Sequence, residues 1–464
     1  MCKITVSDGE NIRILEAAKG EVLSRVLMAK GERLEHPCGG RGVCGKCTVL
    51  VNGEAVLSCR YVVEDDILVE IPREGAIATT TEEEGTEGKC EKTCLCLDLG
   101  TTTMVLALVS EDGKIIKTVT RNNPQRAFAA DVMSRIEYAS KNGTEELKRA
   151  VTDEINSMID SLGIAFTDKL YVAGNTTMLH LLCGADPSSM GKAPYTPVFI
   201  EEKTIHGKAM GIEKAEEVIL TEGISAFVGA DVVAGLGYVK EPEDGKYNFL
   251  VDLGTNAEVV LYSKDKLYCT AAAAGPCFEG VNISCGMSAT EGAIYSCTEY
   301  GCMVVGNGEA KGICATGLID AMAIMKRHEV IDETGFMEEG EYPLKDGVSI
   351  TQGDVRQFQL AKSAICSAME ALTKKAGIGF ESIDKVYVAG GISAKINFNN
   401  ALNVGLLPKE CEGKTVGVNN SCLLGIAKYA TEKNDLSRFT KMAEYVDLAT
   451  DVYFQDLFIE NMGF

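Results

Sequence analysis

The chain has 464 residues, enough for two or three domains that each bury a core. It carries 67 Asp and Glu against 45 Lys and Arg, a formal net charge of −22. Such a surface repels nucleic-acid backbones and anionic membranes, so neither is expected as a partner. No apolar run reaches the roughly 18–20 residues of a membrane span, and the N-terminus lacks the apolar core of a signal peptide. A cytoplasmic protein is expected.

The chain contains 18 cysteines. In a cytosolic protein of this size they are not expected to form a disulfide framework. Some are therefore predicted to be metal ligands and the others small, apolar core residues.

Residues 1–74 are predicted to form short strands around one helix. They contain four cysteines in a glycine-rich context, spaced x5, x2 and x11: Cys38, Cys44, Cys47 and Cys59. Four thiolates suffice for a [2Fe–2S] cluster, and glycines let backbone N–H groups point at sulfur. Zinc is the alternative, but zinc sites usually pair two separate Cys-x-x-Cys knuckles, and only one is present.

A predicted hairpin returns Cys59, the fourth cysteine, to the edge of the loop that contains Cys44 and Cys47. Asn52-Gly53 lies between alternating apolar runs, the strongest short-range hairpin signal. Pairing Val51 with Glu54 puts Cys47 opposite Ser58, with Cys59 next in the chain. The segment resembles ferredoxin-like [2Fe–2S] domains, although the plant type has x4 between its first two cysteines.

Residues 75–92 are acidic and poor in apolar residues, and are predicted to be a flexible linker. Three cysteines lie at or just beyond its end: Cys90, Cys94 and Cys96. No fourth ligand accompanies them, and Cys94 and Cys96 fall in a predicted strand. They are interpreted as structural.

From residue 93 onward, predicted strands alternate with helical segments, which indicates a multidomain α/β architecture. Leu97-Asp98-Leu99-Gly100-Thr101-Thr102 recurs as Val251-Asp252-Leu253-Gly254-Thr255-Asn256, 154 residues later. A single repeat of this length predicts a duplicated domain. We expect one half at 93–240, a second at 241–430 and a helical tail at 431–464.

Three motifs in this part of the chain suit a nucleotide. Two are Asp-x-Gly-Thr turns between strands, where backbone N–H groups and hydroxyls can contact phosphate and the aspartate can orient Mg²⁺. The third is a strand that opens into paired glycines, which allow close approach of an adenosine. The predicted binding residues are Gly100, Thr101, Thr102, Thr103, Gly254, Thr255, Asn256, Gly390, Gly391 and Ser393.

The order of the three motifs resembles the actin-like, ribonuclease H-like ATPases: acetate and sugar kinases, Hsp70 chaperones and actin. The resemblance implies ATP and Mg²⁺ as ligands, with Asp98 and Asp252 positioning the metal. Asp231 lies where such kinases often place a base and would orient the attacking water. The alternative for Asp231 is an N-cap of a helix over 232–237. Asn175 is either a contact to the ligand or a turn residue.

A narrower resemblance covers nearly the whole chain. Its motifs are Asn123-Pro124-Gln125, Arg135-Ile136, Gly174-Asn175-Thr176-Thr177-Met178, Val228-Gly229-Ala230-Asp231, Ala274–Gly280, Gly312–Asp320, Asp354–Gln357 and Gly405–Pro408. With the N-terminal cysteines, they resemble the ATP-dependent reductive activators of corrinoid proteins. Larger members carry a middle domain between linker and ATPase, for which this chain has no room.

The resemblance implies that a [2Fe–2S] cluster passes one low-potential electron to Co(II) of a corrinoid protein of a methyltransferase system, giving Co(I), with ATP hydrolysis as the driving force. A homodimer held by the actin-like part is implied as well. Two alternatives stay open: an actin-fold small-molecule kinase with a redox-sensing domain, and an electron carrier whose ATPase is a degenerate scaffold.

Overall fold

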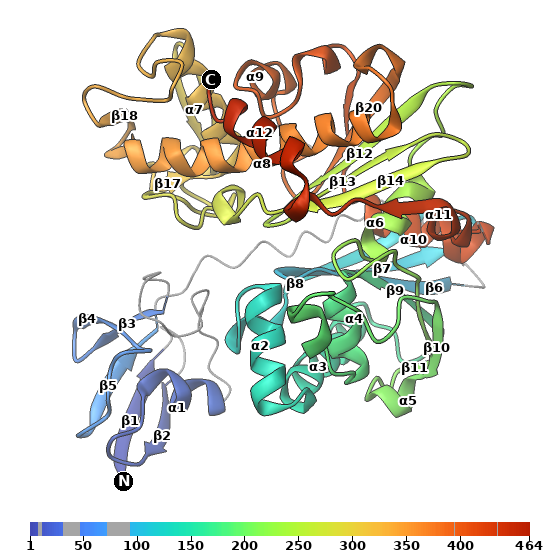
Figure 1. Ribbon diagram of the computed structural model, residues 1–464. Helices are drawn as coiled ribbons and strands as arrows, with labels where there is room; N and C mark the ends of the chain where they lie inside the picture. Colours follow the sequence, from blue (N-terminus) through green and yellow to red (C-terminus); the bar gives the residue numbers. More distant parts are fainter. Residues whose placement is uncertain (8–11, 31–46, 72–92, 394, 434) are drawn as a thin grey trace. The chain divides into compact units, whose positions relative to one another are not determined.

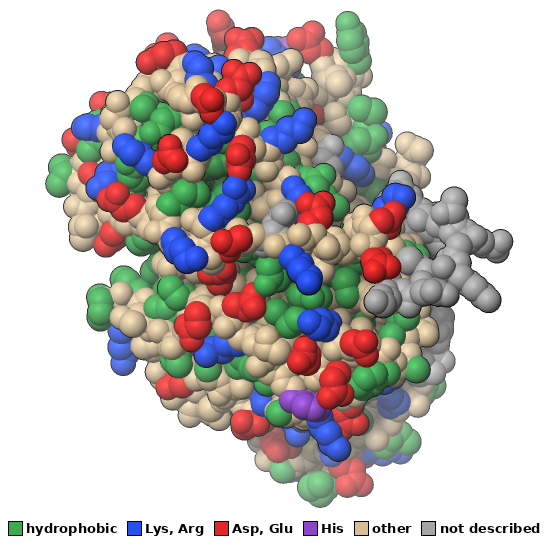
Figure 2. Space-filling view, turned by 90° about the vertical axis from the view of Figure 1, so that its right-hand side faces the viewer, with side chains coloured by type: hydrophobic (Ala, Val, Ile, Leu, Met, Phe, Trp, Pro, Cys, Tyr) green, Lys and Arg blue, Asp and Glu red, His purple; other side chains and the backbone are tan. Residues whose placement is uncertain are grey.

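The computed structural model describes residues 1–7, 12–30, 47–71, 93–393, 395–433 and 435–464 (Figure 1). They form two compact units, one of Met1–Phe199 with Lys203–Leu220, the other of Ile200–Glu202 with Thr221–Phe464. Among the described helices, none has the length and apolar character needed to cross a membrane. On the face seen in Figure 2, acidic side chains are interspersed with Lys and Arg and do not gather in one patch.

The N-terminal part is a mixed five-stranded sheet with one helix, α1 (Leu23–Ala29), packed against it. In spatial order the strands are β2 (Ile12–Ala17), β1 (Cys2–Ser7), β5 (Ile67–Glu70), β3 (Thr48–Val51) and β4 (Glu54–Leu57). β1 and β5 run parallel and the other neighbours antiparallel. Alternate residues of β1, Ile4 and Val6, are fully buried with Leu23 and Leu27. The predicted short strands and single helix are present, arranged as in a β-grasp.

The rest of the first unit is built on a six-stranded sheet. Its spatial order is β10 (Lys203–His206), β11 (Ala215–Leu220), β9 (Thr167–Gly174), β6 (Thr93–Leu99), β7 (Thr103–Ser110) and β8 (Ile115–Asn122). β6, β7 and β8 are antiparallel, while β9 pairs parallel with β6 and β11 parallel with β9. The helices are α2 (Val132–Asn142), α3 (Glu145–Ser161), α4 (Thr176–Cys183) and α5 (Gly207–Met210).

The second unit repeats five strands of this sheet, with its sixth strand at the opposite edge. Its spatial order is β21 (Thr415–Gly417), β20 (Ile383–Ala389), β12 (Tyr247–Leu253), β13 (Ala257–Tyr262), β14 (Leu267–Ala272) and β22 (Ala443–Tyr445). Again three antiparallel strands come first in the chain, β12 to β14, and β20 pairs parallel with β12 and β21 parallel with β20. The matching topology confirms the duplicated α/β fold predicted from the sequence echo.

The second unit adds further elements to its sheet. The remaining strands are β15 (Ala293–Thr298), β16 (Gly301–Val304), β17 (Gly312–Ile313), β18 (Glu341–Lys345) and β19 (Val348–Thr351). The helices are α6 (Ala230–Tyr238), α7 (Ala315–Arg327), α8 (Gln352–Ala376), α9 (Phe398–Asn403), α10 (Ser421–Glu432), α11 (Ser437–Met442) and α12 (Val452–Glu460). The long helix α8 begins with a capping box between Thr351 and Asp354.

Helix α6 belongs to the second unit, because it packs closely on α10. A Cβ placed on Gly425 would lie 1.8 Å from the carbonyl oxygen of Ala234, so only glycine fits at this crossing. The two units therefore divide after Leu220, whereas the sequence suggested a division after residue 240.

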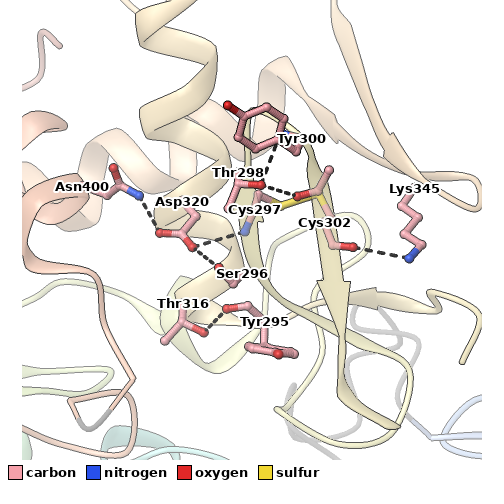
Figure 3. Close-up of a disulfide and its surroundings, with 11 residues drawn as sticks. Tyr295, Ser296, Cys297, Thr298, Tyr300, Cys302, Thr316, Asp320, Lys345 and Asn400 are labelled. Carbon is pink, nitrogen blue, oxygen red and sulfur yellow. Dashed lines mark hydrogen bonds between the residues drawn. A yellow bond between two sulfur atoms is a disulfide. The ribbon is translucent and has the colours of Figure 1, made fainter. Parts of the chain in front are cut away.

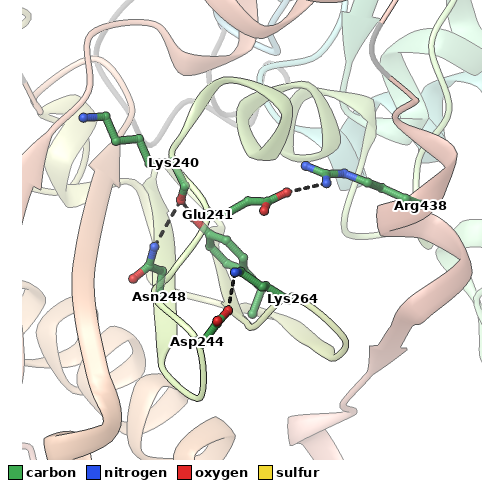
Figure 4. A network of polar contacts seen from close by, with 7 residues as sticks. Lys240, Glu241, Asp244, Asn248, Lys264 and Arg438 are labelled. Carbon is green, nitrogen blue, oxygen red and sulfur yellow. Dashed lines mark hydrogen bonds and ion pairs between the residues drawn. The ribbon is translucent and has the colours of Figure 1, made fainter.

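The connection between α6 and β12 is fastened by polar contacts (Figure 4). Asn248 is fully buried. Its amide donates to the carbonyl oxygen of Lys240 at 3.1 Å and accepts from the backbone N–H of Lys385 at 2.9 Å. On the surface nearby, Lys264 pairs with Asp244 and Arg438 with Glu241.

The C-terminal segment packs on α8. Phe454, Phe458 and Phe464 lie against the core of the second unit. Beneath them the ammonium group of Lys362, a buried residue, donates to the carbonyl oxygens of Asn461 (2.8 Å) and Gly463.

Two cysteines interpreted as core or incidental residues form a disulfide (Figure 3). Cys297 and Cys302 face each other across β15 and β16, with Cα atoms 4.2 Å apart. The antiparallel register, which the spacing of five did not reveal, brings them together. The backbone N–H of Cys297 also donates to buried Asp320 at 3.2 Å. Cys94 and Cys96 lie in β6, as predicted, and Cys96 is fully buried.

Candidate cluster site and nucleotide sites

The predicted hairpin is present in the N-terminal sheet. Asn52 and Gly53 both have positive φ (51° and 87°), as a two-residue turn of this kind requires, and Val51 pairs with Glu54. Beyond the last ladder pair, the backbone N–H and the hydroxyl of Ser58 donate to the carbonyl oxygen of Cys47 at 3.0 and 2.8 Å. Ser58 therefore lies opposite Cys47, as predicted.

The hairpin brings two of the four predicted cluster ligands close together. Cys47 is 1% exposed and Cys59, which follows Ser58, is 9% exposed. Cys38 and Cys44 lie outside the described residues. Within the described ranges no three His, Cys, Asp or Glu side chains gather as a metal site. The two described cysteines fit the cluster prediction because both are buried at one end of a single hairpin.

The first Asp-x-Gly-Thr motif is a tight turn between β6 and β7, as predicted. The backbone N–H of Gly100 donates to the carbonyl oxygen of Thr103 at 3.0 Å. A Cβ on Gly100 would lie 2.6 Å from that oxygen, so the turn requires glycine. Asp98 lies near the end of β6, and Thr101 and Thr102 occupy the turn.

Residues from three other segments hold this turn. Asn123 donates its amide to the carbonyl oxygen of Gly100 and its backbone N–H to that of Thr102, both at 2.8 Å. Arg135 is fully buried, and its guanidinium donates to the carbonyl oxygen of Thr101 at 2.7 Å. Asn175 donates to the Thr101 hydroxyl at 2.8 Å. These residues entered the sequence analysis through resemblance, and the structure shows what they contact.

The second Asp-x-Gly-Thr motif joins β12 and β13 in the second unit. Asp252 pairs with Glu258 across the two strands, and Gly254, Thr255 and Asn256 form the turn. The hydroxyl of Thr255 donates to the carboxylate of Glu279. Glu279 lies in the motif Ala274–Gly280, but no role was predicted for it, and its separation of 24 residues from Thr255 gave no local signal of this contact.

The charges of two other carboxylates, Asp231 and Asp252, reach Glu258. Burial, followed by the charges of Asp231 and Asp252, raises the pKa of Glu258 well above its usual value. Both charges therefore favour the protonated form of Glu258. Asp231 lies in the first turn of α6, whose N-cap is Gly229, so the alternative that Asp231 caps the helix is wrong.

The paired glycines follow β20, as predicted. Gly390 has φ of +94°, and a Cβ there would lie 2.5 Å from the carbonyl oxygen of Leu253 and 2.9 Å from Oδ1 of Asp252. Its missing side chain thus lets the turn pass the end of β12. A Cβ on Gly391 would meet no atom within 4 Å, so this glycine has open space beside it. Ser393 is buried, and its hydroxyl oxygen lies 2.8 Å from the carbonyl oxygens of both Gly390 and Val418, so its one hydrogen can be donated to either. The hydroxyl predicted to contact the nucleotide here fastens the turn.

Comparison with known proteins matches most of the chain to one family. Residues 93–240 match the model of the RACo middle region, and residues 246–464 match the model of the C-terminal domain of RACo, the ASKHA domain. The middle region is therefore present in this chain, and the expectation that there is no room for it is wrong. It occupies the segment predicted to be the first ATPase half.

Three relatives extend the similarity. The corrinoid activation enzyme RamQ of Eubacterium limosum is 26% identical, over 97% of both chains. The [Co(II) methylated amine-specific corrinoid protein] reductase of Methanosarcina barkeri is 25% identical, over 80% of this chain and 76% of the relative. A solved structure of a reductive activator for a corrinoid, iron–sulfur protein has a TM-score of 0.71 and 25% identity, covering 100% of this chain and 98% of that one. The chain belongs to the RACo family of reductive corrinoid activators, with the family's ASKHA domain at its C-terminal end.

Proposed function

We propose that this enzyme reduces the cobalt of a corrinoid protein from Co(II) to Co(I), with ATP hydrolysis driving the transfer of one low-potential electron. The observation that carries the proposal is the fusion in one chain of an N-terminal domain with four closely spaced cysteines to a duplicated α/β body whose C-terminal half matches the ASKHA domain. Two relatives named for corrinoid activation and for Co(II) corrinoid protein reduction support it. The corrinoid partner is proposed to belong to a methyltransferase system, and the enzyme to be a cytoplasmic homodimer.

Cys38, Cys44, Cys47 and Cys59 are proposed to hold a [2Fe–2S] cluster. When bound, a plant-type cluster supplies an electron at about −400 mV. Reducing Co(II) of a corrinoid requires a still lower potential, and each 100 mV costs one electron about 2.3 kcal/mol. The transfer therefore requires added free energy, and ATP hydrolysis is proposed to supply it.

The two turns are proposed to hold Mg²⁺-ATP. Thr101 would bring its hydroxyl to a phosphate, Thr255 would do so once released from Glu279, and Asp98 and Asp252 would position Mg²⁺. Asp231 is proposed to orient the attacking water.

The test mixes pre-reduced protein, Mg²⁺-ATP and a Co(II) corrinoid protein and follows the absorbance of Co(I). We expect Co(I) only when ATP is present. Asp252→Asn should abolish ATP-dependent Co(I) formation but keep the visible absorbance of the cluster, whereas Cys47→Ser should lose both.

Equal Co(I) formation with and without ATP would contradict the coupling. A phosphorylated small molecule appearing in step with ADP would instead indicate the kinase alternative.

A further inference from the structure

We infer that Asn175 is a positioning residue for the first phosphate turn, because its amide orients the Thr101 hydroxyl so that the hydroxyl donates to a phosphate oxygen. This inference rests on the proposed nucleotide site and deepens it. It assigns a task to a residue that does not itself contact the nucleotide.

The orientation of the Asn175 amide follows from its two contacts. The backbone N–H of Met178 lies 3.0 Å from one end of the amide, and a backbone N–H can only donate. That end must be the oxygen, which caps α4. The NH₂ end therefore faces the Thr101 hydroxyl oxygen at 2.8 Å and donates to it.

This direction decides what the hydroxyl can do. A threonine hydroxyl carries one hydrogen and accepts through its oxygen lone pairs. Since the oxygen of Thr101 accepts from Asn175, its own hydrogen remains available to donate. Within the part of the chain that the structure describes, Asn175 is the hydrogen-bond partner of this hydroxyl. A donor set in advance toward developing negative charge needs no reorganisation when the ligand binds.

The backbone around the hydroxyl is fixed as well. Arg135 holds the carbonyl oxygen of Thr101, and Asn123 holds that of Gly100. These contacts fix the backbone of the turn, so the contact with Asn175 determines the direction of the Thr101 O–H bond.

Two substitutions separate this role from helix capping. Ser at an N-cap keeps the capping bond but is too short to reach Thr101. Asp also keeps the cap, yet its carboxylate only accepts, so the Thr101 hydrogen would turn toward it and away from the phosphate. Asn175→Ser should weaken Mg²⁺-ATP binding about 10-fold, and Asn175→Asp, which also adds a repelling charge, about 100-fold.

Asn156→Asp provides a matched control. Asn156 likewise accepts a backbone N–H, from Glu213 at 3.1 Å, and donates to an oxygen, that of Gly211 at 2.9 Å. It lies on α3, outside the two turns. The same change of chemistry there should leave ATP affinity within about twofold of the wild type.

The experiment is titration calorimetry of the full-length protein with Mg²⁺-ATP, with melting temperatures as a check on folding. In a double-mutant cycle, Asn175→Ser should cause no further loss once Thr101→Val has removed the hydroxyl, and Thr101→Ser should keep near-normal affinity. Additive losses, or normal affinity of Asn175→Asp, would overturn the inference alone. A wild-type protein that binds no Mg²⁺-ATP would overturn the proposed function together with it.

Discussion

Asn248 is a buried amide that joins three backbone segments, its own strand β12, Lys240 and Lys385. Replacing it with Ala leaves the backbone N–H of Lys385 without this partner, at about 1–3 kcal/mol, while the carbonyl oxygen of Lys240 keeps the hydroxyl of Tyr262 at 2.9 Å. We expect Asn248→Ala to lower the melting temperature of the second unit by several degrees in a calorimetric scan. Lys264→Ala, which removes an exposed ion pair in the same network, should change it by less than 1 degree. A comparable loss in both variants would contradict this account.

Lys362 is a buried residue whose side chain carries a titratable ammonium group. Burial lowers its pKa to about 8, from 10.5. Between pH 8 and 10.5 the unfolded chain therefore holds a proton that the folded protein releases, so the stability contributed by Lys362 rises with pH in this window. The melting temperature of the wild type minus that of Lys362→Met should increase from pH 7.5 to pH 9.5. A difference that is constant or falls would show that the ammonium group is not titrating in the folded state.

At the scale of elements, the crossing of α6 and α10 depends on a glycine. Gly425→Ala improves helix propensity by about 1 kcal/mol but drives a methyl group into the carbonyl oxygen of Ala234. We expect a net loss of about 3 kcal/mol, seen as a lower denaturation midpoint in urea. Gly308→Ala is the control, since a Cβ there meets no atom within 4 Å. Unchanged stability of Gly425→Ala would mean that the helices separate at little cost.

The sequence predicted those elements whose determinants are local. Asn52-Gly53 specifies its own turn, so the position of Ser58 opposite Cys47 followed by counting. The two Asp-x-Gly-Thr turns were likewise predicted from short local motifs. Contacts between distant segments left no such signal: Arg135 reaching Thr101, Thr255 reaching Glu279, and the disulfide between Cys297 and Cys302.

At the scale of the whole molecule, the N-terminal domain that is proposed to hold the cluster and the C-terminal ASKHA domain have separate hydrophobic cores. Ile4, Val6 and Val69 belong to one, and Phe249 and Phe358 to another. Because each part buries its own core, each is expected to keep its ligand without the other.

We therefore expect Cys47→Ser to lose the visible absorbance of the cluster and yet bind Mg²⁺-ATP within about twofold of the wild type by calorimetry. Gly391→Ala is the reverse control. Its methyl group would enter the open space where the adenosine is proposed to bind, so ATP binding should weaken while the visible absorbance of the cluster is kept. Loss of ATP binding in Cys47→Ser would indicate that the two ligands are thermodynamically coupled even at rest.

The three residues of β22 affect how the protein behaves at high concentration. This strand pairs parallel with β14, and Val446 continues the contact by donating its backbone N–H to the carbonyl oxygen of Cys269 at 2.8 Å. Without it, β14 would present a row of unpaired backbone groups, the template on which strands of separate molecules join. With β22 in place the edge strand of the sheet has three residues instead of six, a poorer template for aggregation, and substitutions there should affect solubility before they affect catalysis.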